Sequence, residues 1–444
     1  MDVSRRTFFQ GALIAASATR VIGANDTINV GIVGLGTRGP ALMQYCAKIP
    51  KVQVAGLCDV KQEARERARG LQQELTPGQK ATEFVDLREM FADKAIDAVL
   101  LSVPVHWHAL AAIWGCEAGK DMYVEKPATY NIHESHRIVE TARKTNRIVQ
   151  TGLQSRSMAH KIHAIQLLHD GAIGKVYMSK SLCFKPRVSM GKTPPEPVPA
   201  GVNWDLFSGP APLRPYTKNR VSYTWNWLWD YGSGDITNAG AHEIDVARWG
   251  LGDPGMPKSA MCSGGKYVWD DDQEVPNTQY CSFDYGDREL VFEVRALPSG
   301  PEAGEPVISG VTKYGWYPGG VQGHLTVGNL FMGGNGWMWL DNSGFKIYKG
   351  EGSELAMQVK NEHADRSDQI AHVQNFMEAC RSRKTSDLHC PIEVGAMSAA
   401  VSHMGTISYR VGRKVVWDDA KGRFVNDAEA DKLISRDYRK PYVV

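Results

Sequence analysis

The sequence predicts an α/β fold: a doubly wound parallel sheet followed by an α+β domain with an open, mainly antiparallel sheet. An apolar, β-branched run at residues 28–33 leads into a glycine-rich turn. Apolar strands and helices then alternate up to residue 152, which is typical of parallel sheets with helices on both faces. Beyond residue 152, short alternating segments bounded by glycine turns replace that alternation, as in antiparallel sheets.

The parallel sheet is predicted from short apolar runs, each followed by an amphipathic segment. The run at 98–103 is almost entirely apolar, as expected for a strand buried on both faces. We expect strands at 28–33, 52–58, 98–103, 121–125 and 147–151, and helices at 40–49, 61–75, 106–118 and 132–145.

The second half of the chain contains a proline-rich stretch at 186–215 that is too polar and too interrupted for a core element. It is longer than an ordinary connection, so it either wraps the surface or covers a site. Around it we expect strands at 175–183, 280–285 and 290–295, further strands in the glycine-rich region 315–344, and helices at 158–170, 368–381 and 394–410.

The glycine turn has the spacing Gly34-x-Gly36-x-x-Gly39 between a predicted strand and a predicted helix. Gly34 permits the tight turn, Gly36 lets the backbone approach a pyrophosphate, and Gly39 lets the helix pack on the strand. The helix N-terminus offers N–H groups to the phosphates. Asp59 ends the next strand about twenty residues later, where a carboxylate accepts hydrogen bonds from the adenosine ribose. This combination predicts a dinucleotide site.

The cofactor is predicted to be NAD, because the Asp59 carboxylate would repel the 2′-phosphate of NADP. Lys61 and Arg38 lie close enough in sequence to weaken that preference, so NADP remains possible.

A second signal is the triplet Glu125-Lys126-Pro127 at the end of another apolar strand. This strand end lies where the nicotinamide would sit if the glycine turn held a dinucleotide. Lys126 is therefore a candidate for contact with the reacting group, although a strand-end lysine can also be an ordinary surface residue.

Composition and charge exclude several other classes. The 444 residues include 51 basic and 49 acidic side chains, which gives no reason to expect nucleic acid or an acidic membrane surface as a partner. No apolar segment after the N-terminal region is long enough to span a bilayer, so membrane insertion is not expected. The eight cysteines form no Cys-x-x-Cys pair, and we expect no required disulfide.

The N-terminus carries the features of an export signal. Arg5 and Arg6 precede a short apolar stretch at 11–18, as in twin-arginine signals, and cleavage is expected near Gly23-Ala24. We therefore expect a signal peptide at 1–24, a dinucleotide-binding domain at 25–152 and a substrate and oligomerisation domain at 153–444. The mature protein would be periplasmic or otherwise exported.

Together these motifs resemble the Gfo/Idh/MocA family, named after glucose–fructose oxidoreductase and inositol dehydrogenase. The resemblance spans nearly the whole mature chain and implies a Rossmann domain, a nicotinamide-dependent sugar or polyol oxidoreductase, and a homodimer or homotetramer formed through the open sheet. It rests on the glycine turn, Asp59, Pro104 with His106-Trp107-His108, Glu125-Lys126-Pro127, Gln154-Ser-Arg156, and Gly240-Ala-His242-Glu-Ile-Asp245.

The resemblance implies that Lys126 lies between nicotinamide and substrate and polarises the reacting oxygen. His242 is the expected base, because its unperturbed pKa lies near the working range. The family usually has an aspartate four residues earlier, where this chain has Asn238. Asn238 can hydrogen-bond a substrate hydroxyl but cannot accept a proton. Asp235 and Asp245 are possible replacements, and we take Asp245 to be structural.

Trp225, Trp227 and Trp229 lie in an aromatic segment close to the His242 loop. In a strand their spacing would place all three rings on one side, where they could form a wall for a sugar, although a buried aromatic stripe or an oligomer interface is about equally consistent.

The histidines do not have the spacing of a metal site, and none is expected. The predicted cofactor site comprises Gly34, Gly36, Thr37, Arg38, Gly39, Asp59, Pro104, His106, His108, Glu125, Lys126 and Gln154; the predicted substrate site comprises Lys126, Arg156, Trp225, Trp227, Asn238 and His242.

Three functions fit these features. The first is an exported oxidoreductase that acts on a secondary hydroxyl of a sugar or glycoside and keeps its NAD(P) firmly bound, since free nucleotide is scarce outside the cytoplasm. The second is a redox-neutral glycosidase or lyase that works through a transient keto intermediate. The third is an inactive sugar-binding protein, which the presence of Lys126 and His242 argues against.

Overall fold

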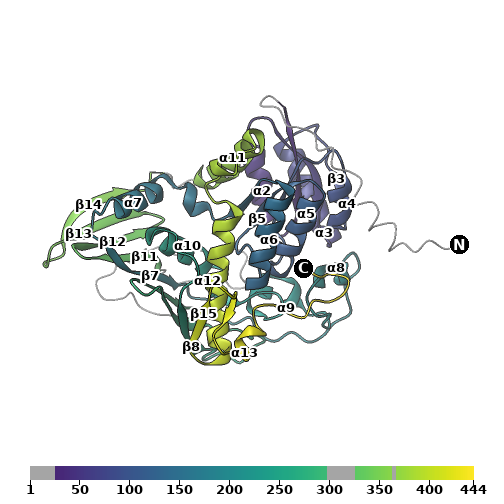
Figure 1. Ribbon diagram of the computed structural model, residues 1–444. Helices are drawn as coiled ribbons and strands as arrows, with labels where there is room; N and C mark the ends of the chain where they lie inside the picture. Colours follow the sequence, from purple (N-terminus) through teal and green to yellow (C-terminus); the bar gives the residue numbers. More distant parts are fainter. Residues whose placement is uncertain (1–25, 298–325, 363–366) are drawn as a thin grey trace.

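The computed structural model describes residues 26–297, 326–362 and 367–444. Two sheets lie on either side of the long helix α12 (Ile392–Val411), as Figure 1 shows. The predicted signal peptide falls outside the described residues.

The N-terminal sheet is parallel and has the strand order β3-β2-β1-β4-β5-β6, which is the doubly wound arrangement expected from the sequence. The fold class is confirmed. The short strand β3 and helix α4 were not predicted from the sequence. The elements are β1 (Ile28–Val33), α2 (Arg38–Cys46), β2 (Val52–Cys58), α3 (Gln62–Leu75), β3 (Thr82–Phe84), α4 (Leu87–Ala92), β4 (Ala98–Leu101), η1 (Val105–Trp107), α5 (His108–Glu117), β5 (Asp121–Glu125), α6 (Ile132–Thr145) and β6 (Val149–Gly152).

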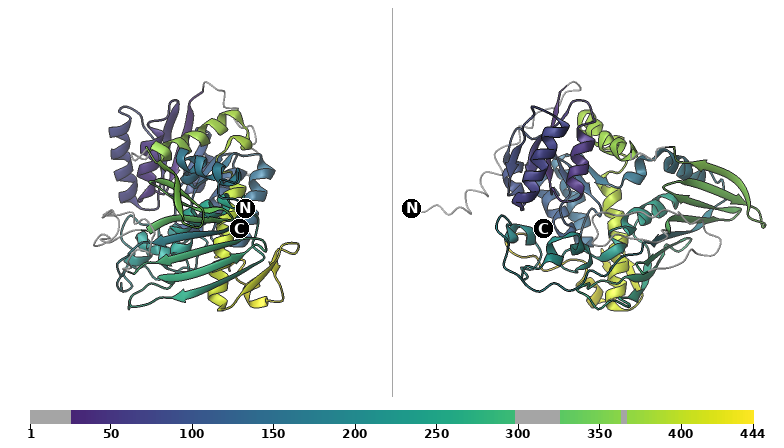
Figure 2. Two further views of the ribbon diagram at one scale, coloured as in Figure 1. Left: turned by 90° about the vertical axis from the view of Figure 1, so that its left-hand side faces the viewer. Right: turned by 180° about the vertical axis from the view of Figure 1, so that it is seen from behind.

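The second sheet has ten strands, in the order β14-β13-β12-β11-β7-β10-β9-β8-β15-β16, and only the β10–β7 pair is parallel among the pairs described. Figure 2 shows it as a broad layer with one face turned away from the helices. Its strands are β7 (Val176–Phe184), β8 (Ser259–Gly265), β9 (Thr278–Asp284), β10 (Glu289–Arg295), β11 (Thr326–Gly333), β12 (Gly336–Asp341), β13 (Gly344–Lys349), β14 (Glu354–Lys360), β15 (Val415–Asp418) and β16 (Arg423–Phe424).

Helices cover the other face of this sheet and join it to the first domain. Helix α10 (Gly240–Gly250) and helix α12 pack against the strands, and α12 also contacts α6. Helix α11 (Ser367–Ser382) follows the second sheet in sequence but packs on α2, and its buried Phe376 and Met377 belong to the core of the first domain. The remaining helical elements are η2 (Gln154–Ser157), α7 (Ala159–His169), α8 (Trp204–Ser208), α9 (Lys218–Val221), η3 (Tyr223–Trp227), η4 (Gly234–Ile236), η5 (Thr385–Asp387) and α13 (Ala428–Asp431).

One expectation about the cysteines is wrong. Cys262 and Cys281 lie opposite each other on β8 and β9, with their Cα atoms 4.1 Å apart, and form a disulfide. The six other cysteines are buried thiols, as expected of small apolar residues.

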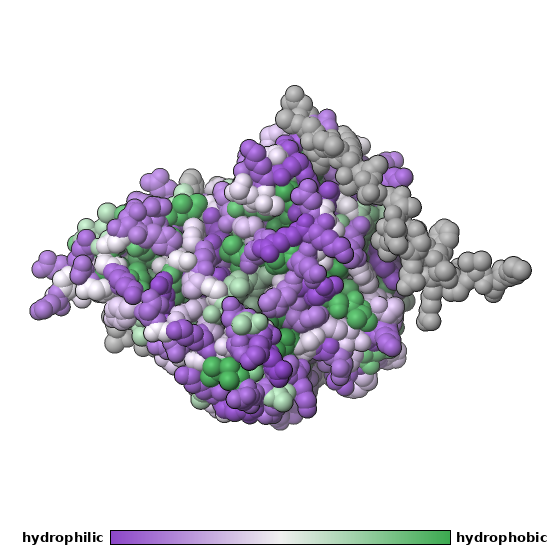
Figure 3. Space-filling view, in the orientation of Figure 1, coloured by the Kyte–Doolittle hydropathy of each residue, from purple (hydrophilic) through white to green (hydrophobic). Residues whose placement is uncertain are grey.

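The surface seen in Figure 3 is mainly hydrophilic, with hydrophobic residues scattered over it. Within the described parts of the chain, no helix combines the length and the apolarity needed to cross a membrane.

Candidate active site

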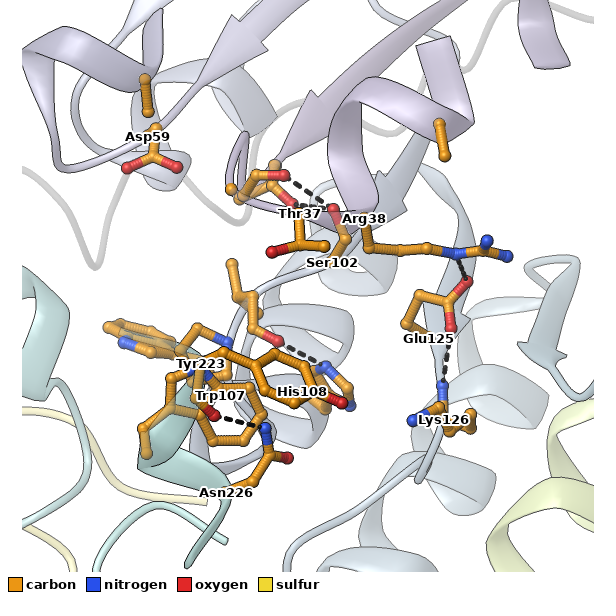
Figure 4. A pocket seen from close by; sticks show the side chains of 18 of the residues that line it. Thr37, Arg38, Asp59, Ser102, Trp107, His108, Glu125, Lys126, Tyr223 and Asn226 are labelled. Atoms are coloured by element: carbon orange, nitrogen blue, oxygen red, sulfur yellow. Dashed lines mark hydrogen bonds and ion pairs between the residues drawn. The ribbon is translucent and has the colours of Figure 1, made fainter. Parts of the chain in front are cut away.

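A cavity of about 910 Å³ lies at the carboxyl ends of the parallel strands and is lined by residues of both domains. This end of a doubly wound sheet is where such folds bind ligands. Asp59 and Lys126 lie on opposite sides of the site in Figure 4, with Thr37 and Ser102 between them. The arrangement suits an elongated ligand that is held at both ends.

The glycine turn is closed by Ser102 at the end of β4. Gly34 has a φ of +88°, and a Cβ atom there would lie 2.6 Å from the Ser102 backbone. The Ser102 hydroxyl donates a hydrogen bond to the Gly34 carbonyl at 2.7 Å. Gly36 faces open space, because a Cβ atom there would have no neighbour within 4 Å, whereas at Gly39 it would lie 2.2 Å from the Gly34 oxygen. Gly36 thus leaves room for a pyrophosphate, while Gly39 lets the helix approach the turn and does not line the cavity.

Asp59 follows β2 and is fixed beside the turn by two backbone N–H groups. Its Oδ2 accepts from Leu35 at 2.7 Å and its Oδ1 accepts from Lys61 at 2.8 Å. Burial raises the pKa of Asp59, and these two hydrogen bonds oppose the rise. The carboxylate lines the cavity, where its remaining lone pairs fit ribose hydroxyls.

At the opposite end, the Lys126 ammonium donates to Asn238, at 2.9 Å to the side-chain oxygen and at 3.1 Å to the backbone oxygen. Burial lowers the pKa of Lys126 to about 8, against the attraction of Glu125. Glu125 accepts hydrogen bonds from Arg38 at 2.7 Å and from Gln154 at 3.2 Å, so the predicted residues around this strand end form one connected network.

His242 lies in the first turn of α10 and lines the cavity together with Lys126 and Asn238. Burial lowers the pKa of His242 well below its usual value, and the positive charges of Lys126, Lys161, Lys185 and Arg38 lower it further. The ring is therefore neutral near pH 7 and able to accept a proton. Asn238 adds no negative charge that would counter this effect.

The two histidines after Pro104 have different surroundings. His108 lines the cavity, and its ring nitrogens face the carbonyls of Pro127 at 2.6 Å and Val103 at 2.8 Å. Contrary to the prediction, His106 does not border the cavity. It is buried against the Phe207 carbonyl at 2.9 Å, and burial lowers its pKa to about 3.

Arg156 does not reach the cavity either, so the expectation that it binds substrate does not fit the structure. Its guanidinium is buried in ion pairs with Asp245 at 2.8 Å and Asp253 at 2.6 Å, and it stacks over Trp249. Asp245 is thereby structural, as expected. Asp235 is likewise engaged, in a buried ion pair with Arg187 at 2.6 Å.

Trp225 and Trp227 lie in a 3₁₀ turn, η3, rather than in a strand, and Trp229 follows that turn, so the three rings do not share a face. Trp225 lines the cavity, but Trp227 is 1% exposed and packs away from it beneath the Arg187 guanidinium. Trp229 stacks near Tyr409. The prediction for Trp227 is therefore wrong, because the helical turn separates residues that a strand would align.

Many other residues that line the cavity were not predicted, among them Tyr223, Asn226 and Lys185. Tyr223 lies close to Asn238, with its hydroxyl 3.2 Å from the amide nitrogen. Its position two residues before Trp225 was the only sequence signal for it. Of the predicted set, the cavity brings together Gly34, Gly36, Thr37, Arg38, Asp59, Pro104, His108, Glu125, Lys126, Gln154, Trp225, Asn238 and His242.

The residues present fit a nicotinamide dinucleotide. The open space over Gly36 supplies a phosphate site, the fixed Asp59 carboxylate supplies a ribose site, and the part of the cavity lined by Lys126 supplies a nicotinamide end. In the described ranges, no cluster of three or more histidine, cysteine, aspartate or glutamate side chains could hold a metal ion.

The fold and the cavity define an NAD-binding oxidoreductase. The chain belongs to the Gfo/Idh/MocA oxidoreductase family: residues 28–153 match its NAD-binding Rossmann fold, and residues 160–260 and 332–444 match its C-terminal alpha/beta domain.

Among curated relatives, the chain is similar to a glycosyl hydrolase family 109 protein of Saccharopolyspora erythraea, with 28% identity over 157 residues, 34% of each chain. It is also similar to an alpha-N-acetylgalactosaminidase of Shewanella oneidensis, with 30% identity over 125 residues, 28% of this chain and 27% of the relative. The matched region thus spans about a third or less of these relatives.

Two solved structures share the fold. The WlbA dehydrogenase of Bordetella pertussis, in complex with NADH and UDP-GlcNAcA, superposes with a TM-score of 0.63 at 17% identity, over 89% of this chain and 99% of that one. Levoglucosan dehydrogenase, in complex with NADH and levoglucosan, superposes with a TM-score of 0.63 at 15% identity, over 88% of this chain and 99% of that one.

Proposed function

We propose that this protein is an exported NAD-dependent oxidoreductase that acts on a secondary hydroxyl of a sugar or glycoside and keeps its cofactor bound between turnovers. One observation carries the proposal: Lys126 of the first domain and His242 of the second line the same cavity. Lys126 lies on the side of the site opposite Asp59 (Figure 4).

The two side chains have complementary tasks. Bound NAD⁺ would supply the hydride acceptor. The Lys126 ammonium stabilises negative charge on the substrate oxygen, and its lowered pKa of about 8 makes it a better proton donor than an exposed lysine. The neutral His242 ring accepts the hydroxyl proton. Asn238 holds the ammonium through its side-chain and backbone oxygens, so it positions Lys126 without neutralising it.

A sugar is the substrate class that the cavity wall favours. Trp225 and Tyr223 offer aromatic surface to C–H groups, and Asn226 and Asn238 offer amides. Two of the solved structures that share the fold are dehydrogenases in complex with sugar-containing ligands, which supports the same class.

A redox-neutral glycosidase is the second candidate, favoured by the curated relatives described as glycosyl hydrolases. The same Lys126 and His242 would serve it, because oxidation of a ring hydroxyl acidifies the neighbouring C–H bond and permits elimination. Such a cycle regenerates NAD⁺ in place, which suits a protein that keeps its cofactor.

Export and self-association are part of the proposal. The paired arginines near the N-terminus and the Cys262–Cys281 disulfide support an oxidising compartment such as the periplasm. Partly exposed apolar side chains on the outer face of the second sheet, including Tyr177, Met261 and Tyr280, support a homodimer or homotetramer through that face.

Product analysis tests the proposal. Purified protein is incubated with p-nitrophenyl α-N-acetylgalactosaminide and with free sugars, and products are identified by mass spectrometry. A keto-sugar or sugar acid supports oxidation, whereas free nitrophenol without net redox change supports cleavage. Formation of neither product by protein that contains NAD would contradict both functions.

A further inference from the structure

A segment of the second domain, residues 199–222, lies against the loop that carries Asp59; we call it the strap. It contains α8 and α9 and overlaps the second half of the proline-rich stretch at 186–215. The strap forms hydrogen bonds with the three residues after Asp59. The loop that positions the Asp59 carboxylate is therefore held by contacts within the first domain and by contacts with the second domain. Its contacts are the Gln62 N–H to the Gly201 carbonyl at 2.8 Å, the Asn203 N–H to the Val60 carbonyl at 3.0 Å and the Lys61 ammonium to the Val221 carbonyl at 2.8 Å.

The strap also forms part of the cavity wall. Leu206, Phe207, Val221 and Ser222 line the cavity that contains Asp59 and the glycine turn. A dinucleotide bound to Asp59 and the turn would therefore lie between the first domain and the strap.

The carbonyl end of α8 is anchored on the first domain by two buried side chains. Trp107 donates from its indole nitrogen to the Leu206 carbonyl at 2.9 Å, and the His106 ring contacts the Phe207 carbonyl at 2.9 Å. His106, which the cavity does not use, thus has a role in holding the strap.

The C-terminal tail also holds the strap, through an ion pair and hydrogen bonds to residues of α8 and the loop after it. The Arg439 guanidinium donates to the carboxylate of Asp205 in α8 at 2.5 Å and to the Asp205 backbone carbonyl at 2.7 Å. It also donates to the Gly209 carbonyl at 2.9 Å. Tyr442 donates to Asp205 at 3.0 Å, while its buried ring packs on Trp107. Figure 1 shows the chain's yellow end running to the region of α8. We call Asp205, Arg439 and Tyr442 the clasp.

We propose that the strap retains the bound dinucleotide and that the clasp keeps the strap in place, so the cofactor leaves only when the clasp opens. Arg439 and Tyr442 are positioning residues that act through α8 and do not touch the cofactor. The inference rests on the retained cofactor of the proposed function and gives that property a structural cause.

The test measures cofactor release directly. Full-length protein is loaded with NADH, and loss of NADH fluorescence is followed after a chase with excess NAD⁺. Arg439→Ala should release NADH at least about ten-fold faster than wild type, because weakened closure acts on the dissociation rate. Tyr442→Phe, which removes one hydroxyl, should give a smaller increase in the same direction. Arg423→Ala is the matched control, since this exposed arginine pairs with Asp431 outside the strap.

Hydrogen exchange on the same samples gives a second readout. NADH should slow exchange in peptides from 199–222, and Arg439→Ala should abolish that protection. If exchange in the strap rises in Arg439→Ala while the release rate equals that of Arg423→Ala, the strap is structural and the inference is wrong. If Arg439→Ala does not fold, the test uses Tyr442→Phe and wild type. The inference is overturned if Tyr442→Phe releases NADH at the wild-type rate and NADH does not slow hydrogen exchange in the strap. Wild-type protein that binds NADH but releases it within the mixing time contradicts the proposed retention itself.

Discussion

Replacing Lys126 with methionine should stabilise the protein while it abolishes turnover. The ammonium is buried, and its pKa falls from 10.5 to about 8, a shift of roughly 2.5 units. At about 1.4 kcal/mol per unit, keeping this lysine protonated at pH 7 costs roughly 3 kcal/mol. Loss of the two hydrogen bonds to Asn238 offsets about 1 to 2 kcal/mol of that gain. Lys126→Met should therefore gain about 1 to 2 kcal/mol.

The gain should depend on pH in a defined direction. The folded-state pKa of Lys126 lies below its unfolded value, so the cost is fully present below about pH 8 and is relieved as the pH rises from about 8 to 10.5. The charging cost in wild type should fall from roughly 3 kcal/mol at pH 7 to about 1 kcal/mol at pH 9.5. The net advantage of Lys126→Met, about 1 to 2 kcal/mol at pH 7, should therefore disappear across that window.

Thermal unfolding of dinucleotide-free protein at the two pH values measures this effect. A gain of this size corresponds to a rise of about 2 °C in the midpoint for a chain of this length. Lys48→Met is the control, because Lys48 is exposed and its loss should change the midpoint very little. A lower midpoint for Lys126→Met than for Lys48→Met, or a difference that does not change with pH, would refute the argument that Lys126 is a desolvated cation held for catalysis.

Two further predictions concern the ends of the cavity. Asn238→Asp places a carboxylate against the Lys126 ammonium and beside His242, so it should raise the pKa of both groups. In wild type, activity that needs the protonated lysine falls above about pH 8. This limb of the pH–rate profile should move to higher pH in the variant. An unmoved limb would mean that Lys126 does not control it. Wild type should prefer NAD to NADP, because Lys61 is bound to the Val221 carbonyl and Arg38 to Glu125, which leaves neither in place for a 2′-phosphate. Asp59→Ala should lower the ratio of NAD affinity to NADP affinity about ten-fold in fluorescence titrations. An unchanged ratio would show that Asp59 does not select the cofactor.

The parts of the site that the sequence predicts well are those set by local geometry. The glycine spacing dictates the turn, and a charged residue at the end of a parallel strand necessarily lies at the ligand-binding edge. Asp59, Glu125 and Lys126 therefore occupy the predicted places at this edge. The doubly wound parallel sheet and most of the predicted element boundaries follow from the alternation of apolar strands with amphipathic helices.

The parts that fail depend on long-range packing. His106 and His108 are two residues apart, yet only tertiary contact with α8 turns His106 away from the cavity. The pairing of Arg156 with Asp245 and Asp253 joins residues about ninety positions apart. Trp227 was misplaced because a β-propensity for aromatic residues was overridden by a 3₁₀ turn, and the docking of α11 on α2 has no signal in the local sequence.

In the proposed reaction, a substrate carbon passes hydride to a nicotinamide held between Asp59 and Lys126. The most direct measurement is isotope transfer in a single turnover. Protein loaded with NAD⁺ is mixed with a panel of sugars and p-nitrophenyl glycosides deuterated at their ring carbons, and the dinucleotide is released by denaturation and weighed. When the reaction is quenched at intervals during the first turnover, wild type should carry deuterium on the reduced nicotinamide with at least one member of the panel. The label should persist if the reaction is an oxidation and be transient if it is a cleavage, because the same deuterium then returns to the product; Lys126→Met should carry none. A panel member converted to product with no deuterium ever found on the dinucleotide, or a loaded protein that no panel member reduces, would contradict the account.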